Sequence, residues 1–231
     1  MAARVPIKTI SSESLLLDKL PRTTRDAFLY CTKLSWLDPH LWYLAGGTAL
    51  ALQVGHRESV DLDFFTSQPT FQETNLERDL LSTNQWVTSL REKGTVYGTL
   101  MGAKMSFIAY PFFIPYSTIL QCGMVRILPP SDIAAMKIII ISQRGRKRDF
   151  IDLYWCCTHM QESLERLVER ALEQYPGEGH NIPHIIKSLA YFDDAEEDPM
   201  PKLFVKLEWG TIKKYFQREA AALAKKILNL P

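Results

Sequence analysis

Disulfide, metal-knuckle and membrane-spanning patterns are all missing from this 231-residue sequence. Its four cysteines show no C-x-x-C spacing, and two of them, Cys156 and Cys157, are adjacent. We therefore expect reduced thiols in a cytoplasmic protein rather than a zinc site or a disulfide framework. The longest apolar runs, such as Ile138–Ile141, fall far short of the roughly 18 residues that span a bilayer. The first ten residues lack the apolar stretch of a signal peptide, so neither export nor membrane insertion is expected.

An excess of one charge is missing as well. Lys and Arg number 27 against 26 for Asp and Glu, which leaves a net charge of +1. The chain as a whole is therefore not attracted to nucleic acid or membrane, and any site for a polyanion must be local. Hydrophobic residues make up 46% and charged residues 23%, values typical of a globular protein with a real core.

The predicted elements change character near residue 128. The first part mixes both patterns: helical over 12–36 with a break at Pro21, strand over 41–45, a short helix up to Gly55, strand over 60–65, helix over 73–81, and strands over 85–91, 95–101 and 103–109. After Pro129-Pro130 the patterns are helical, over 131–142, 148–159, 161–174, 183–191 and 211–228, with an acidic loop over 193–201. The sequence thus predicts an α+β protein, with a mixed core over 1–128 and a helical domain over 129–231.

Two carboxylates, Asp61 and Asp63, stand one residue apart in a predicted strand. Side chains at i and i+2 share one face of a strand, with Cα atoms about 6–7 Å apart. Two acids at that spacing repel each other unless a cation lies between them. Mg²⁺ or Mn²⁺ suits such oxygen ligands and is usually held by one or two carboxylates together with substrate phosphates. An exposed strand face that carries two acids is the alternative.

A second set of candidate site residues lies where the preceding strand ends and a short helix begins, at Gly46, Gly47 and Thr48. Glycines at such a corner let backbone N–H groups approach an anion, and a helix N-terminus adds positive potential. Gly46, Gly47 and Thr48 are therefore a candidate cradle for phosphates. A tight turn with Thr48 as a simple N-cap accounts for the same residues. Taken together with the two acids, the corner indicates a nucleoside triphosphate (NTP) site.

Two blocks of sequence resemble a known family. The first, AGGTAL…HRESVDLDFF, resembles the signature of the polymerase-β-like nucleotidyltransferases, and with the later SDIAAMKIIIISQRGRKRDFIDLYW it resembles their AbiEii/AbiGii toxin group. The resemblance implies a small mixed β-sheet nucleotidyltransferase core with flanking helices, followed by a C-terminal helical domain that closes the cleft. It also implies metal-dependent transfer of a nucleoside monophosphate (NMP) from an NTP to an acceptor. For the toxin group that acceptor is RNA, notably the tRNA 3′ end, and an antitoxin protein is an expected partner.

The resemblance also assigns roles to residues of the second block. Lys137 matches the helical lysine of the group, as a phosphate ligand, although a lysine in an apolar helix can also extend to solvent. Asp152 matches the group's late functional acid and would order Lys137, a metal-bound water or the acceptor. Asp149 is interpreted as a structural residue that is favoured by the helix dipole or paired with an arginine.

Further polar residues have two interpretations each. Ser59 shares the predicted carboxylate face and could touch phosphate, whereas Arg57 contacts the NTP, orients an aspartate or stays at the surface. The one dense basic cluster is either a solvated loop or an RNA backbone contact. It consists of Arg144, Arg146, Lys147 and Arg148.

The sequence departs from the superfamily at one position. Many members carry a third metal-binding carboxylate on a later strand, but no Asp or Glu occurs between Glu92 and Asp132. The strand GAKMSFIAY offers Lys104, a further candidate for NTP binding or an exposed residue, and Ser106. Without the third acid, Asp152 substitutes, a second metal binds weakly, or transfer is slow or lost. A regulatory or partner-binding module that only binds NTP is therefore the alternative function.

Overall fold

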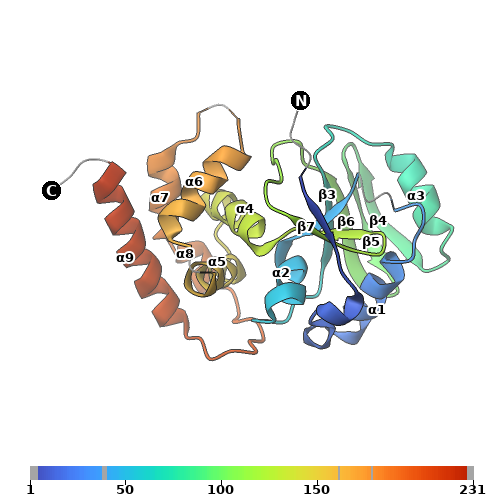
Figure 1. Ribbon diagram of the computed structural model, residues 1–231, viewed down its shortest axis with the longest axis horizontal. Coiled ribbons are helices and arrows are strands. Elements are labelled where there is room, and N and C mark those ends of the chain that lie inside the picture. Colours follow the sequence, from blue (N-terminus) through green and yellow to red (C-terminus); the bar gives the residue numbers. More distant parts are fainter. Residues whose placement is uncertain (1–4, 38–40, 161, 178, 228–231) are drawn as a thin grey trace. The chain divides into compact units, whose positions relative to one another are not determined.

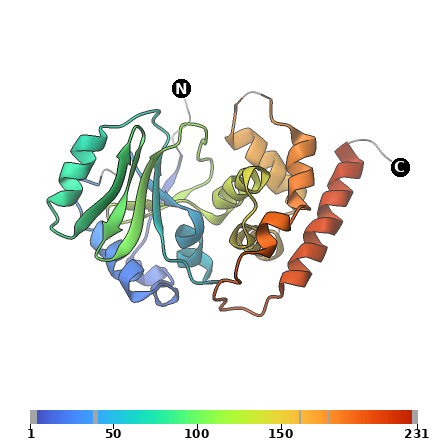
Figure 2. The ribbon, with the colours of Figure 1, turned by 180° about the vertical axis from the view of Figure 1, so that it is seen from behind.

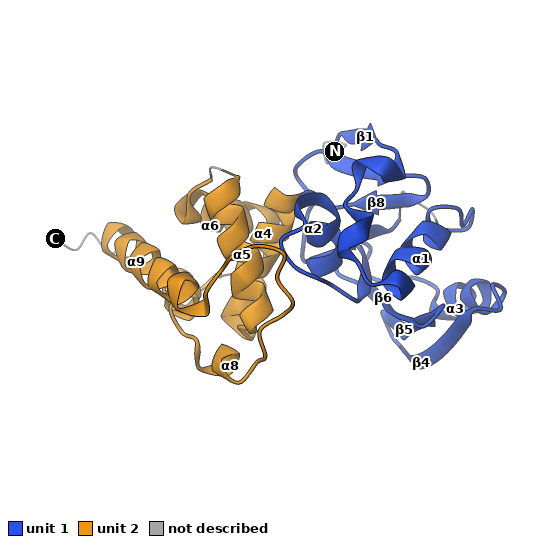
Figure 3. Ribbon diagram, turned by 90° about the horizontal axis from the view of Figure 1, so that it is seen from below, with its two compact units in different colours: residues 1–129 blue, residues 130–231 orange. Residues whose placement is uncertain are grey.

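The computed structural model describes residues 5–37, 41–160, 162–177 and 179–227. The chain divides into two compact units, residues 1–129 and 130–231, which Figure 3 shows in different colours. Within the described residues, no helix combines the length and the apolar composition that crossing a bilayer requires.

Unit 1 is built on a mixed sheet of eight strands in the order β1-β7-β8-β2-β3-β6-β5-β4, counted over the described residues (Figures 1 and 2). The strands are β1 (Ile7–Thr9), β2 (Tyr43–Ala45), β3 (Leu62–Thr66), β4 (Trp86–Glu92), β5 (Thr95–Leu100), β6 (Ala103–Ala109), β7 (Ile119–Cys122) and β8 (Val125–Ile127). Strand β3 is central: it pairs antiparallel with β2 and parallel with β6. Strand β4 forms one edge and contains a register shift between Thr88 and Leu90.

Alternation along β3 separates the hydrophobic core from the polar face of the sheet. Leu62 and Phe64 are buried, and Asp63 between them points to the opposite face. Phe64 lies in register with Phe107 of β6, and their rings stack at 5.1 Å. Because burying a Leu or Phe side chain stabilises a fold by about 1.5–3 kcal/mol, this core determines which face Asp63 takes.

Three α-helices in the described part of unit 1 pack around the sheet. They are α1 (Arg22–Cys31), α2 (Gly46–Val54) and α3 (Glu73–Leu81), and two short 3₁₀ helices, η1 (Ser12–Ser14) and η2 (Leu17–Lys19), precede α1. Helix α1 packs against β6, and α3 packs against β4 and β5. Helix α2 follows β2 without a loop and ends at Gly55, which adopts a left-handed conformation with φ +62°. The first residue of α2 is therefore held at the end of a sheet strand.

Unit 2 consists of helices in its described residues. They are α4 (Pro130–Gln143), α5 (Lys147–His159), α6 (Leu164–Gln174), α7 (Ile182–Leu189), α8 (Asp193–Glu196) and α9 (Trp209–Ile227). Helix α4 packs against α5, α6 and α7, so it is buried on nearly every side. A helix that is apolar all round is typical of such a central position. The aromatic rings of Phe150 on α5 and Phe216 on α9 meet at 5.5 Å and join these two helices.

The predicted α+β class, with a mixed sheet followed by helices, is confirmed. A helical conformation throughout 12–36 is wrong: only 22–31 is α-helical, because Pro21 marks the N-terminal boundary and 3₁₀ turns precede it. The acidic stretch 193–201 contains the short helix α8 and is not entirely a loop. The predicted helix start at 161 and the helix end at 228 lie outside the described residues.

Candidate active site

The diglycine corner brings several predicted residues together in unit 1. Gly46 has φ +72°, and a β-carbon added there would lie 3.3 Å from Asp63 Oδ2. A β-carbon added at Gly47 would lie 2.5 Å from Arg57 Nη2 and 2.9 Å from Ser59 Oγ. Such approaches are too close for any side chain at 47 unless its neighbours move. The two glycines therefore leave room for one carboxylate, one guanidinium and one hydroxyl to converge on the backbone.

Thr48 connects this corner to the residues before β3. It is buried inside the first turn of α2, so its predicted role as the N-cap is wrong: the helix starts two residues earlier, and its N-cap is Ala45. The Thr48 hydroxyl donates to the backbone carbonyl of Asp61 and lies 3.0 Å from Ser59 Oγ. A sequence pattern shows where a helix can start, but the hydrogen bond to residue 61 depends on the tertiary fold.

The two acids have different surroundings. Asp63 lies within β3, and its Oδ1 accepts a hydrogen bond of 2.7 Å from Ser106 of β6. Asp61 comes one residue before β3, and its Oδ1 atom is buried without a hydrogen-bond partner. Leaving a buried acceptor unsatisfied costs about 1–3 kcal/mol, and more when the group is charged. A positive ligand at Asp61 would remove that penalty.

These donors fit a divalent cation. Carboxylate oxygens suit Mg²⁺ and Mn²⁺. Asp61 Oδ1 accepts no hydrogen bond, so its lone pairs are available for coordination. No group of three or more His, Cys, Asp or Glu side chains suited to a metal occurs in the part of the chain that the structure describes. The protein would therefore supply one or two carboxylates, and substrate phosphates and water would complete the coordination, which is the usual arrangement for Mg²⁺.

Arg57 and Lys104 lie in different settings on unit 1. Arg57 is only 3% exposed, and its Nη1 donates to the carbonyl of Glu58 at 3.0 Å, so the alternative of a surface residue is wrong. Lys104 is exposed on β6, two residues before Ser106 and therefore on the same strand face. The Arg57 guanidinium is thus held beside the diglycine corner, whereas Lys104 is exposed to solvent.

In unit 2, Lys137 sits between two acids. Its Nζ lies 2.6 Å from Asp149 Oδ1 and 2.8 Å from Asp152 Oδ2, and all three side chains are at most 7% exposed. Lys137 therefore does not extend to solvent, and Asp149 pairs with this lysine rather than with an arginine. Burial raises the pKa of the neighbouring Cys156 thiol well above its usual value, and the charge of Asp152 adds to this effect. The cluster combines one positive with two negative groups.

The basic cluster at the start of α5 divides into two pairs. Arg146 Nε donates to both carboxylate oxygens of Asp198, at 2.9 and 2.7 Å, and Lys147 donates to the backbone carbonyls of Glu196 and Asp198. Arg144 and Arg148 are exposed. Half of the predicted RNA-contacting cluster is therefore bound to the acidic segment that follows α7.

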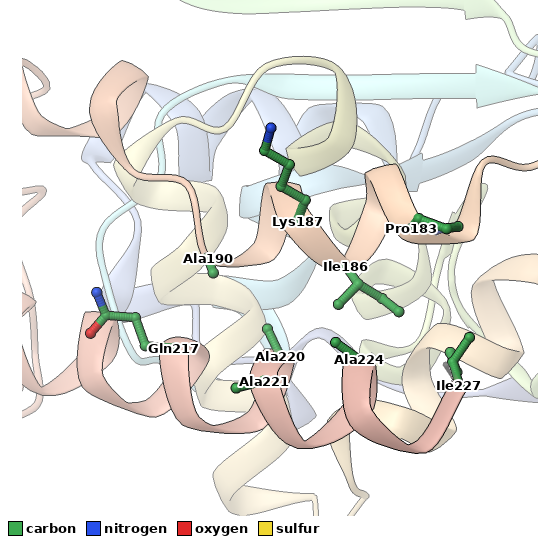
Figure 4. Close-up of a pocket in the computed structure, with 9 residues that line it drawn as sticks. All are labelled: Pro183, Ile186, Lys187, Ala190, Gln217, Ala220, Ala221, Ala224 and Ile227. Atoms are coloured by element: carbon green, nitrogen blue, oxygen red, sulfur yellow. The ribbon is translucent and has the colours of Figure 1, made fainter. Parts of the chain in front are cut away.

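An apolar groove of about 300 Å³ lies between α7 and α9 (Figure 4). It is lined by Pro183, Ile186, Lys187, Ala190, Gln217, Ala220, Ala221, Ala224 and Ile227. Lys187 extends away from α9 in Figure 4, and no lining residue is an acid. This groove therefore lacks the carboxylates that a metal–phosphate site needs, unlike the corner in unit 1.

Sequence reasoning missed how Ser106 contributes. The sequence shows Ser106 only as part of a strand without acids, and its hydrogen bond to Asp63 depends on the parallel pairing of β3 with β6. Forty-three residues separate the two side chains, so no local pattern reveals the contact. A buried-type strand pattern with a hydroxyl at position 106 is the one available signal.

A mixed sheet with a diglycine corner against an Asp-x-Asp strand defines a protein of the nucleotidyltransferase class. The family model described as "Nucleotidyl transferase AbiEii toxin, Type IV TA system" matches residues 28–98 and 106–227. The chain belongs to this family of toxin nucleotidyltransferases, as its two sequence blocks predicted.

The chain is also similar to individual proteins. An uncharacterised protein of Aquifex aeolicus (strain VF5), aq_aa25, is 34% identical over 182 residues, which cover 77% of this chain and 85% of that protein. A crystal structure from H. pylori, provisionally described as a nucleotidyltransferase, is similar with a TM-score of 0.53 at 17% identity, over 91% of this chain and 99% of that one. MenT4, a nucleotidyltransferase toxin from Mycobacterium tuberculosis H37Rv, has a TM-score of 0.48 at 14% identity, over 88% of this chain and 86% of that one.

Proposed function

We propose that this nucleotidyltransferase moves an NMP from an NTP to the 3′ hydroxyl of an RNA, with tRNA as the acceptor and Mg²⁺ or Mn²⁺ as the cofactor. In this reaction the acceptor oxygen bonds to the α-phosphorus, the bond from that phosphorus to the leaving oxygen breaks, and pyrophosphate departs. The hydroxyl proton passes to a base. The observation that supports the proposal most strongly is the orphaned, buried Oδ1 of Asp61, two residues from the Asp63 carboxylate that faces Gly46.

The corner residues would bind the triphosphate. Backbone N–H groups in the first turn of α2, at residues 46–48, have no helical acceptor of their own and lie at the positive end of the helix. Arg57 adds a fixed positive charge beside Gly47, and Ser59 adds a hydroxyl. A bound divalent cation would stabilise the charge that develops on the phosphate oxygens. Asp61 and Asp63 are the residues that would hold it.

Lys137 and Asp152 are proposed as catalytic residues of unit 2. Their match to the family's second block and their burial as an ion pair support this assignment. Arg144 and Arg148 are proposed RNA contacts because they are exposed, and Arg146 and Lys147 are proposed to hold the loop that presents them.

A label-transfer assay tests the function. Purified protein is incubated with Mg²⁺ or Mn²⁺, total tRNA and each α-labelled NTP in turn, beside the variants Asp63→Ala and Asp61→Asn. We expect label on tRNA from the unmodified chain and at least about a hundredfold less from either variant, because each variant has one fewer carboxylate charge to hold the metal–phosphate complex. Asp79→Asn, at a partly exposed acid on α3, is the matched control. Transfer that survives both Asp61 and Asp63 replacements would contradict the proposal.

A module that only binds NTP is the second candidate, and the lack of a three-acid metal cluster among the described residues favours it. The same samples distinguish the two functions. Saturable NTP binding that depends on Asp63, with no transfer to tRNA or other RNA, would support the module.

Membership of a toxin–antitoxin family implies an antitoxin and an NTP substrate. We propose that the chain acts in the cytoplasm, where NTPs and tRNA occur, which agrees with its four buried free thiols. Expression of the chain alone should slow growth, and co-expression of a small neighbouring reading frame should restore it. An Asp63→Ala chain that remains equally toxic would contradict toxicity through nucleotidyl transfer.

A further inference from the structure

Strand β6 places a hydroxyl and an ammonium beside the two acids. Strands β3 and β6 are parallel, with Asp63 level with Ser106 and Leu62 level with Met105. Lys104 shares the strand face of Ser106 and comes one residue before Met105, so it lies at the level of Asp61. Ser106 is 3% exposed and donates to Asp63 Oδ1 at 2.7 Å, whereas Lys104 is exposed.

The charges on this face suit one divalent cation. Asp61 and Asp63 together carry two negative charges when ionised, which one such ion neutralises. A second ion would need a further acidic ligand, and Ser106 donates a hydrogen to Asp63 where an additional acid could otherwise stand. The hydrogen bond also uses one lone pair of Asp63 Oδ1 that would otherwise be available to a cation. The ammonium of Lys104 carries a positive charge that can approach phosphate. Unlike a second metal ion, it needs no acidic side chain to hold it there.

We propose that this active site takes a single divalent cation, that Ser106 positions Asp63 for it, and that the Lys104 ammonium contacts the triphosphate where a second cation would otherwise be needed. This inference rests on the proposed function, because it concerns the same acids and the same NTP. Ser106 acts through Asp63 and is therefore a positioning residue, whereas Lys104 touches the substrate.

Counting bound Mn²⁺ tests the stoichiometry. The full chain is titrated with Mn²⁺ in the presence of non-hydrolysable α,β-imido analogues of the four NTPs in turn, against blanks with nucleotide alone. Electron paramagnetic resonance reports the number of ions bound per chain and any magnetic coupling between two of them. We expect one uncoupled ion in the unmodified chain and a second in Ser106→Asp. Two coupled ions in the unmodified chain would overturn the inference.

Affinity separates positioning from a merely structural role. Ser106→Ala should weaken Mn²⁺ binding about tenfold, the effect of one lost charge-assisted hydrogen bond, while its melting temperature and circular dichroism stay close to those of the unmodified chain. Ser106→Thr keeps a hydroxyl and should restore the affinity. Equal Mn²⁺ affinity in Ser106→Ala and the unmodified chain would refute the role of Ser106, even if Ser106→Asp fails to fold.

The Lys104 variants test the substrate contact. Lys104→Ala should weaken binding of the imido analogues about tenfold, Lys104→Arg should retain most of it, and Lys93→Ala, an exposed lysine in the β4–β5 turn, is the matched control. An effect of Lys104→Ala no larger than that of Lys93→Ala would overturn this part. If Mn²⁺ binds neither to the unmodified chain nor to the variants, the proposed metal-dependent function fails as well. Two bound ions with intact transfer would refute only the single-ion inference.

Discussion

Replacing Lys137 by methionine should destabilise unit 2 strongly. The lysine is the positive partner of two carboxylates, Asp149 and Asp152, that are almost entirely removed from solvent. Methionine has a similar length and no charge, so the change removes the positive charge that lies against both buried acids. Removing one partner of a buried ion pair costs about 3–5 kcal/mol. For a chain of this size each kcal/mol lowers Tm by about 2–4 °C, which amounts to about 6–20 °C.

Two companion variants identify the cause of this loss. Asp149→Asn leaves Lys137 paired with Asp152 and should cost much less than Lys137→Met. The triple variant Lys137→Met/Asp149→Asn/Asp152→Asn removes every charge of the cluster. It should recover much of the free energy of unfolding that Lys137→Met loses, because no uncompensated charge is then buried. Urea unfolding followed by circular dichroism measures the free energy of unfolding of each variant. A Lys137→Met chain within about 1 kcal/mol of the unmodified protein would refute the electrostatic reasoning.

Three further predictions concern the corner, the basic residues and the acidic segment. Gly47→Ala should reduce both NTP affinity and transfer at least about tenfold, because a β-carbon would approach a guanidinium nitrogen to 2.5 Å and displace it. Arg144→Ala/Arg148→Ala should raise KM for tRNA and leave NTP binding unchanged. The slope of the logarithm of the tRNA binding constant against the logarithm of the salt concentration should become shallower by about 0.7 for each lost phosphate contact. Asp198→Asn should lower stability at neutral pH, because the hydrogen bond from Arg146 lowers the pKa of Asp198. A depressed pKa stabilises the folded state above the ordinary value of 3.8, so the difference between the two chains should vanish as the pH falls through the folded pKa.

Each of these changes has a control. Gly177→Ala adds a β-carbon that meets no atom within 4 Å and should leave transfer intact. Lys187→Ala removes a basic residue of unit 2 outside the basic cluster and should not alter tRNA binding. Denaturant titrations of Asp198→Asn at pH 7 and at low pH provide the comparison with the unmodified chain. A stability difference that persists at low pH would mean that the Asp198 side chain acts by packing and not by charge.

The sequence predicts the parts of the fold that rest on strong local patterns. The strands over 95–101 and 103–109 and the helix over 73–81 were placed within one residue, since alternation or helical periodicity repeats over their length. Strands β1, β7 and β8 were missed, because each has only three or four residues and lacks the longer apolar run that marks β2. In the candidate site, spacing alone indicates the acids and the diglycine corner as candidates. The buried position of Arg57 and the bond from Ser106 to Asp63 depend on contacts between distant segments, which no local periodicity contains.

The irregularity in β4 has a consequence for how this chain behaves at high concentration. β4 is an edge strand of the sheet, and its residues Val87 and Leu90 are 67% and 43% exposed. An edge strand with exposed apolar side chains can pair with an extended segment of another chain. The shift of register between Thr88 and Leu90 bends the strand and interrupts the regular row of backbone donors and acceptors. Deleting Ser89 would straighten this border, and the protein should then self-associate through it at concentrations where the natural chain stays dispersed.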